Sequence, residues 1–140
     1  MRKLALSDEI LLSVQQPARY LGNEMNVVMK NPSTVDIRFA MCFPDVYEIG
    51  MSHLGMQILY AMFNKREDVW CERLFSPWTD LDKVMREQHI PLFALESQDP
   101  VKNFDFLGFT IQYEMCYTNI LQVLDLSGIP LKSSTCRMLV

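Results

Sequence analysis

Apolar runs alternate with polar and proline-containing segments along this chain, and this pattern predicts its strands and helices. The segment 35–43 begins with alternating charged positions and then becomes continuously apolar, which is typical of a strand covered on both faces of a parallel sheet. Further strands are predicted at 69–75 and 104–113, and a shorter one at 91–95. The intervals between these strands are long enough to hold helices.

Helices are predicted where apolar residues recur three or four positions apart. Ser7 is the predicted N-cap of a short first helix, and Ser52 that of the helix after the first strand. The apolar face predicted for this second helix consists of Leu54, Ile58, Leu59, Met62 and Phe63. Ser76, which is followed by a proline, is the predicted start of a third helix. The last helix is predicted over 115–126, with Gly128 ending it.

Strands that alternate with helices predict an α/β fold, a doubly wound, Rossmann-like or flavodoxin-like domain with a mainly parallel sheet and flanking helices. Residues 1–34 are interpreted as an N-terminal extension with a short helix, and residues 35–140 as the domain itself. After Gly128 the sequence shows no clear final strand and helix, so the domain is expected to be incomplete at its C-terminus. Such a sheet has an open, apolar edge through which copies of the chain are expected to self-associate.

Composition and charge narrow the range of functions. Of the 140 residues, 49% are hydrophobic and 21% charged, an ordinary composition for one globular domain. The 13 Lys and Arg residues against 17 Asp and Glu residues give a net charge of −4, which argues against nucleic acid or an anionic membrane as a partner. No apolar run has the length of a membrane span or of a signal-peptide core, so a cytoplasmic location is expected.

The cysteines and histidines do not form a metal-binding motif. Cys42, Cys71, Cys116 and Cys136 are far apart, and no C-x-x-C pair occurs. The first three lie in or beside apolar runs and are predicted to be buried thiols. Because the chain has only 2 histidines as well, no metal centre of its own is expected.

The loop after the first strand is the first place to search for a ligand site, because open α/β sheets bind ligands beyond the carboxyl ends of their strands. Gly50 and Gly55 have the spacing of a P-loop, but the residues after them are not the Lys and Ser or Thr that this motif needs. Asp45 and Glu48 would repel a flavin phosphate at the next helix N-terminus. Nucleotide and flavin binding are therefore disfavoured.

The same loop reads Asp45-Val46-Tyr47-Glu48-Ile49-Gly50, and this D-x-Y-x-x-G pattern resembles the D-x-H-x-x-G loop of cobalamin-binding domains. In those domains the histidine ligates cobalt and the aspartate orients it. The resemblance implies that Asp45, Tyr47 and Gly50 contact a cobalamin, with Tyr47 in the histidine position. Ser52 and His53, in the first turn of the following helix, complete the predicted cofactor-binding loop.

A second pattern, Asp105 to Thr110, resembles the D-x-x-G-x-S strand of the same domains, and it implies that the Thr110 hydroxyl faces the buried tail of the cofactor. The segments 39–55, 68–73 and 94–98 resemble, more specifically, the opening of one bacterial group of radical SAM proteins that begin with a cobalamin-binding-like domain.

This longer resemblance implies a domain that positions a corrinoid over the active site of a radical SAM barrel in the same parent chain. The barrel would hold a 4Fe-4S cluster and bind S-adenosylmethionine, and neither is expected in this fragment, which alone is not expected to be an enzyme. The tail 133–140 departs from the family pattern, as expected for a truncated piece.

The candidate residues also have purely structural interpretations. Asp45 and Gly50 could form only a tight turn, and Tyr47 could be a half-buried loop aromatic. His53 could simply cap a helix, and Thr110 could be an ordinary strand-end residue. On these interpretations the domain has kept the fold, lost the cofactor, and serves as a docking or lid module of the same parent protein. The missing histidine at position 47 favours this alternative.

Overall fold

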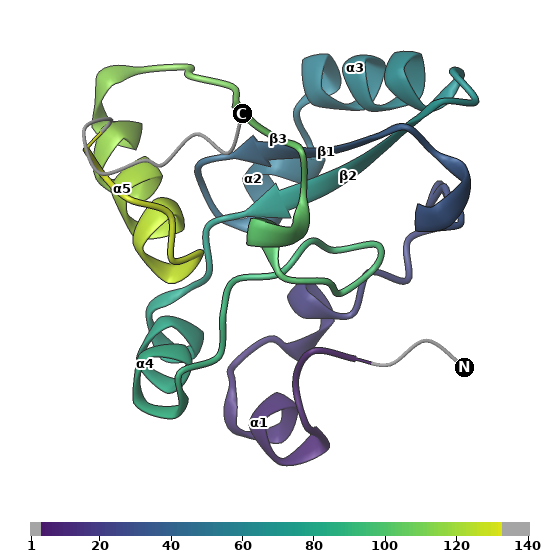
Figure 1. Cartoon of the computed structure of the whole chain (residues 1–140). Helices are drawn as coiled ribbons and strands as arrows, with labels where there is room; N and C mark the ends of the chain where they lie inside the picture. The colour runs from purple at the N-terminus through teal and green to yellow at the C-terminus, as the bar shows by residue number, and fades with distance from the viewer. Residues whose placement is uncertain (1–3, 133–140) are drawn as a thin grey trace.

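A computed structural model describes residues 4–132, which form a three-stranded parallel sheet with helices on both faces (Figure 1). The strands are β1 (Ile37–Phe43), β2 (Val69–Phe75) and β3 (Phe106–Phe109), arranged in the order β2–β1–β3. The chain therefore adds β2 on one side of β1 and β3 on the other, which is the reversal that defines a doubly wound fold. The α/β class predicted from the sequence is confirmed. The tail 133–140, including Cys136, lies outside the described residues.

The helices connect the strands and follow them. They are α1 (Asp8–Ser13), α2 (Tyr47–Met51), α3 (Leu54–Asn64), α4 (Thr79–Gln88) and α5 (Tyr117–Leu126). Short 3-10 turns occupy Pro17–Tyr20, Pro32–Thr34, Val101–Asn103 and Glu114–Cys116. None of the helices within residues 4–132 is long and apolar enough to cross a membrane.

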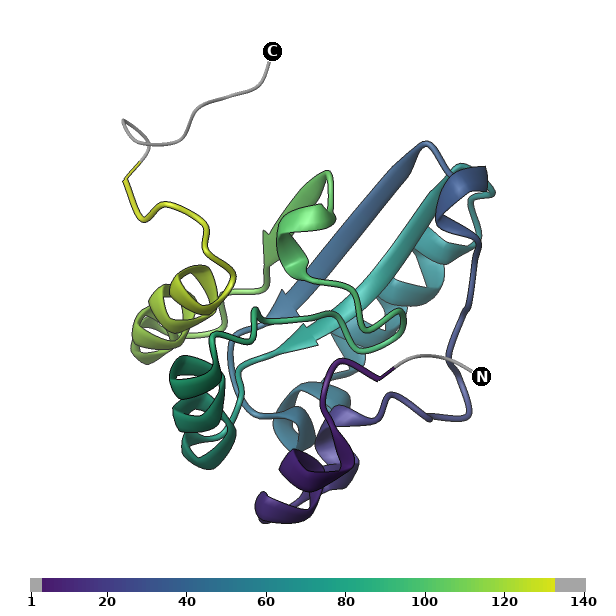
Figure 2. The same ribbon diagram turned by 60° about the horizontal axis from the view of Figure 1, so that its bottom comes forward.

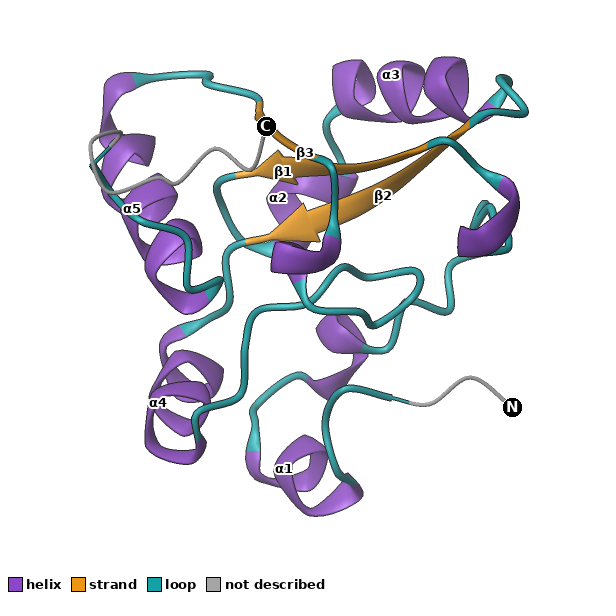
Figure 3. Cartoon of the chain, viewed as in Figure 1, coloured by secondary structure: helices purple, strands orange, loops and turns teal. Residues whose placement is uncertain are grey.

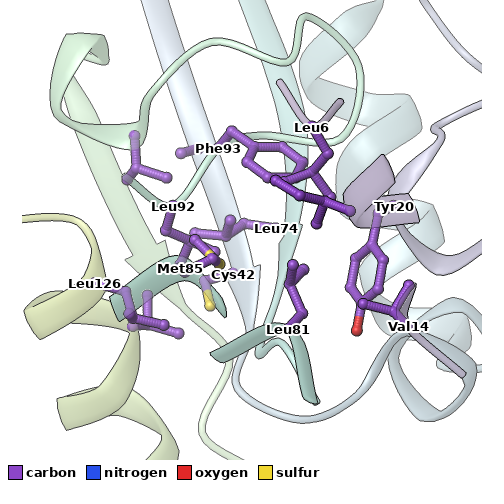
Figure 4. Close-up of a cluster of buried hydrophobic side chains, with 14 of the residues drawn as sticks. Leu6, Val14, Tyr20, Cys42, Leu74, Leu81, Met85, Leu92, Phe93 and Leu126 are labelled. Atoms are coloured by element: carbon purple, nitrogen blue, oxygen red, sulfur yellow. The ribbon is translucent and has the colours of Figure 1, made fainter. Parts of the chain in front are cut away.

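The core has two parts because successive side chains of β1 point to opposite faces of the sheet. On one face, Met41 and Phe43 pack with α3 residues such as Met56. On the other face, Ala40 and Cys42 pack with side chains of α4, α5 and the N-terminal segment. Figure 4 shows this second cluster, in which the following residues are labelled: Leu6, Val14, Tyr20, Cys42, Leu74, Leu81, Met85, Leu92, Phe93 and Leu126. The three described cysteines are buried and free, as predicted.

Several local predictions are confirmed. Ser7 caps α1, since its hydroxyl oxygen accepts the Ile10 N–H at 3.4 Å. The strand predicted at 69–75 has these bounds in the structure. Gly128 follows the end of α5 in the left-handed conformation, with φ of +66°, which favours glycine.

Two strand predictions differ from the structure. The strand predicted at 91–95 is wrong: the segment makes one isolated bridge and one hydrogen bond to β2, from Leu95 N–H to Arg73 O at 2.9 Å. A ladder does not extend there because the Glu96 carboxylate accepts the Arg73 N–H at 2.6 Å, in the place of a strand. The strand predicted at 104–113 is shorter, because 3-10 turns stand before and after β3.

The helix starts predicted at Ser52 and Ser76 are also wrong. Ser52 ends α2, and its hydroxyl donates to Glu48 O at 2.7 Å, while His53 is the N-cap of α3. Ser76 lies before α4, whose N-cap position is Trp78, and its hydroxyl is hydrogen-bonded to the Gln122 side chain of α5. In each case the serine hydroxyl is hydrogen-bonded to a group outside the helix turn that it was predicted to cap.

The exposed face of α3 is also not the predicted one. Leu54, Ile58 and Met62 are 71%, 57% and 50% exposed, whereas Met56 and Tyr60 are buried against the sheet. Because α3 is apolar on most of its circumference, its sequence did not determine its rotation about the helix axis. Leu59 and Phe63 are partly buried, as predicted.

Candidate functional site at the carboxyl edge of the sheet

The loops that follow the three strands meet at the carboxyl edge of the sheet, to which the arrowheads of β1 and β2 point in Figure 3. Asp45, just after β1, connects these loops. Its Oδ2 accepts a hydrogen bond from the Tyr113 hydroxyl at 2.7 Å, and its backbone oxygen accepts the Ser76 N–H at 3.0 Å. Its Oδ1 accepts the Val46 N–H at 2.7 Å. Asp45 therefore joins the ends of all three strands.

Thr110, the first residue after β3, lies at this edge. Its N–H and its hydroxyl both donate to Cys42 O, at 3.0 and 3.4 Å. The hydroxyl that was predicted to face a cofactor tail is thus bonded to the end of β1. It anchors the loop that carries Tyr113 toward Asp45.

Tyr47 begins α2 and points away from Asp45, toward the N-terminal segment. Its hydroxyl donates to Glu24 at 2.8 Å, and its ring packs edge-on against Phe75 with centroids 5.5 Å apart. Burial, assisted by Glu24, raises the pKa of Tyr47 to about 12. The phenol is therefore neutral and already hydrogen-bonded. The Asp45–Tyr47 pair implied by the cobalamin-domain pattern does not form in the described part of the chain.

Gly50 lies in α2 where the helix meets the sheet. A β-carbon there would lie 2.3 Å from Cε1 of Phe75 and 3.2 Å from Cβ of Phe43, so close packing of the helix on the sheet accounts for this glycine. Farther along the loop, Ser52 is exposed, and the His53 Nδ1 accepts the Met56 N–H at 3.2 Å. The His53 ring also lies 5.1 Å from that of Phe43, so His53 is a capping residue.

A buried ionic group, which sequence reasoning missed, lies behind Tyr47. Arg73 of β2 is fully buried, and its Nε donates to Glu96 Oε1 at 2.6 Å. Glu24 lies on its other side, with Oε2 3.7 Å from Arg73 Nη2, and the Tyr60 ring lies 4.4 Å from the guanidinium carbon. Burial raises the pKa of Glu96 to about 7, although the Arg73 charge lowers it. This Arg73 cluster holds the N-terminal segment against α2 and β2.

A polar crevice of about 260 Å³ opens beside Asp45, between the loop after β2 and the start of α5. Its polar and aromatic lining consists of Asp45, Ser76, Trp78, Thr79, Thr118, Asn119 and Gln122. Asn119 donates to Pro44 O at 2.9 Å, which holds α5 against the loop after β1. Trp78 is 42% exposed. The crevice offers hydroxyl, amide and aromatic contacts to a ligand at this edge.

The sequence analysis thus located the carboxyl edge of the sheet but missed most of the residues that lie there with Asp45. Asp45 and Thr110 lie at the carboxyl edge together, Tyr47 and Gly50 lie where α2 meets β2, and Ser52 and His53 serve the junction of α2 and α3. Tyr113 and the crevice residues could have been found by applying the same carboxyl-end rule to the loops after β2 and β3. No local pattern indicated that Glu24 or Glu96 would reach Arg73.

Within residues 4–132 no group of three or more His, Cys, Asp or Glu side chains is placed to hold a metal ion. The fold and the three converging loops define a doubly wound α/β domain with a ligand-accessible carboxyl edge. The family model described as radical SAM proteins, N-terminal, matches residues 55–138, more than half of the chain. The chain therefore belongs to this family of N-terminal domains of radical SAM proteins. No curated protein and no solved structure matches it.

Proposed function

We propose that this chain is the N-terminal module of a radical SAM enzyme and that it presents the carboxyl edge of its sheet to a radical SAM barrel of the same protein. Family membership supports this role, and the convergence of three loops at Asp45 supports the carboxyl edge as the contact surface. In the parent protein a 4Fe-4S cluster and S-adenosylmethionine, held by the barrel, would supply the radical chemistry. The module contributes binding and orientation.

Within this role, we propose that the edge binds a corrinoid without a protein ligand below the cobalt. The residues fit the group only in part. The hydroxyl and amide groups of the crevice beside Asp45 suit the amide-bearing rim of a corrin. A neutral Tyr47 bonded to Glu24, and a His53 that caps α3, do not suit a cobalt ligand. The module would therefore hold the corrinoid by its periphery.

The second candidate is a cofactor-free docking or lid module. One observation favours it: the side chains that the resemblance assigned to the cofactor already have partners inside the chain. Asp45 accepts from Tyr113, Tyr47 donates to Glu24, and Thr110 donates to Cys42. In this case the same edge contacts the barrel directly.

Corrinoid retention distinguishes the two candidates. The purified chain is mixed with hydroxocobalamin and desalted, and its visible spectrum is recorded. Retention that falls in Asp45→Asn is expected if the edge binds the corrinoid. The matched control is Asp36→Asn, because Asp36 is exposed and lies at the amino end of β1. A colourless wild-type protein supports the cofactor-free module instead.

The cobalt coordination is tested with cob(II)inamide, which lacks the nucleotide base and so has no axial nitrogen of its own. Electron paramagnetic resonance of the protein-bound form is expected to show no nitrogen splitting. Splitting that disappears in His53→Ala would make His53 a ligand and contradict binding without a protein ligand.

A further inference from the structure

Residues 24–30, which we call the strap, form an irregular segment between two 3-10 turns at the periphery of the domain (Figure 2). In the described part of the chain, no backbone–backbone hydrogen bond joins the strap to another segment. Side chains hold it instead: Val28 N–H donates to the Tyr60 hydroxyl at 2.8 Å, and Trp70 Nε1 donates to Val28 O at 3.0 Å. At the far end of the strap, Lys30 Nζ donates to a backbone oxygen at the start of β2 at 2.6 Å. The hydrogen bonds between the strap and α3 or β2 are thus all made through side chains.

The strap also buries little apolar surface. Met25 is fully exposed and Met29 is 52% exposed, and of the strap residues Val28 is the one that packs against the core on the α3 face. Segments with few buried apolar contacts open locally at a lower free energy than the strands and helices of the core. The strap can therefore open while the sheet and α3 stay folded.

One end of the strap contributes to the Arg73 cluster, in which two carboxylates lie beside one guanidinium. Glu96 is fully buried, and its Oε1 accepts from Arg73 Nε at 2.6 Å. The strap residue Glu24 is more loosely paired, because its side chain is 12% exposed and its Oε2 lies 3.7 Å from Arg73 Nη2. Asn26 of the strap also accepts from Arg73, at 3.1 Å. One guanidinium neutralises one carboxylate, so the cluster has an excess negative charge when Glu24 and Glu96 are both ionised.

In the described chain, the groups that face Glu96 from β2 and α3 add no unpaired positive charge. Glu72 is a buried acid that is itself paired with Arg38, at 2.7 Å. Burial, together with Glu96, raises the pKa of Tyr60, so the α3 phenol beside the cluster is neutral. Burial and the same two acids raise the pKa of the Cys71 thiol to about 12, so it is neutral as well. The ionised form of Glu96 is therefore disfavoured by burial as long as the cluster stays closed.

We infer that the strap opens locally when Glu96 ionises, while the sheet stays folded. Opening admits water to the excess carboxylate, whereas a protonated Glu96 leaves Glu24 and Arg73 as a neutral pair under the closed strap. It also releases the Tyr47 hydroxyl, which donates to Glu24 in the closed form. Burial raises the pKa of Glu96 to about 7, so the closed strap is most stable below about pH 4, and this stabilisation is lost as pH rises through 7.

Hydrogen exchange of the full chain between pH 5 and 8 tests this opening. The protection factor corrects for the intrinsic effect of pH on exchange. For the Val28 amide it should fall about tenfold or more, as expected for a carboxyl pKa that is raised from about 4 to about 7. The Trp70 indole N–H, which is bonded to Val28 O, should lose protection in parallel. The amide of Cys42, in the central strand β1, should stay about a hundredfold or more better protected at every pH, because its exchange requires opening of the sheet.

Three variants, each with folding verified by far-UV circular dichroism, identify the groups involved. Glu96→Gln cannot ionise, so the pH dependence of Val28 protection should disappear. Glu24→Gln removes the excess charge from the strap side and should make the fall smaller, and it carries the test if Glu96→Gln does not fold. The matched control is Glu87→Gln, on the exposed side of α4, which should leave the fall unchanged. Wild-type protection that does not change with pH, equal protection of Val28 and Cys42, or an unchanged fall in Glu96→Gln or Glu24→Gln would each overturn the inference.

Discussion

Replacement of Gly50 by alanine tests how closely α2 packs on the sheet. In an unconstrained helix this change stabilises by about 1 kcal/mol. Here the added β-carbon would lie 2.3 Å from the ring of Phe75, which is only 9% exposed and is held edge-on by Tyr47. Overpacking of this kind costs about 1–3 kcal/mol. Because the ring has little room to move, we expect a net loss of about 1–2 kcal/mol in the free energy of unfolding.

The assay is urea denaturation followed by far-UV circular dichroism, with a double-mutant cycle. In a Phe75→Leu background the clashing ring atoms are gone, so Gly50→Ala should become neutral or stabilising there. The coupling between the two positions should then be at least about 1 kcal/mol. An unchanged effect of Gly50→Ala in the two backgrounds, or a variant more stable than the wild type, would refute the packing argument.

This packing changes how substitutions at Gly50 are interpreted. A bulkier Gly50→Val variant should lose stability, so any loss of corrinoid retention in it would follow from disturbed packing. For this reason the comparison of Asp45→Asn with Asp36→Asn is the better test of binding, since both replace one carboxylate by an amide.

Three further predictions concern the polar groups around β2. Tyr47→Phe removes the hydrogen bond to Glu24 at 2.8 Å and should lower the free energy of unfolding by about 1–3 kcal/mol in urea titrations; no loss would contradict it. Asn64→Ala leaves the N–H and C=O of buried Cys71 without partners and should cost about 2–4 kcal/mol in the same assay, whereas a change below 1 kcal/mol would contradict it. Burial raises the pKa of Glu96 to about 7, so its proton stabilises the folded state fully below about pH 4 and this contribution is lost as pH rises through 7. Between pH 5 and 8 the wild type should therefore lose stability relative to Glu96→Gln, and parallel pH profiles would refute this.

The sequence determined the architecture because the strands of a doubly wound sheet have strong local signals. The buried second half of β1 appears as a continuous apolar run, and β2 is buried along its whole length with apolar residues on both sides of Glu72 and Arg73; 69–75 was predicted to the residue. Gly128 was predicted as a helix end because the left-handed conformation there favours glycine. The carboxyl-end rule, which follows from topology alone, pointed to the loop after β1 that holds Asp45, whereas Thr110 was singled out by the family resemblance.

Tertiary structure alone decided which polar groups meet and which helix face is buried. Asp45 bonds Tyr113, and Tyr47 bonds Glu24, across long sequence separations that no local pattern records. The same holds for Arg73, whose burial depends on a carboxylate from a distant segment. The rotation of α3 was also open, because a helix apolar on most sides can bury either face. Periodicity reports the local preference of a segment, whereas hydrogen-bond partners and burial depend on what the rest of the chain places beside it.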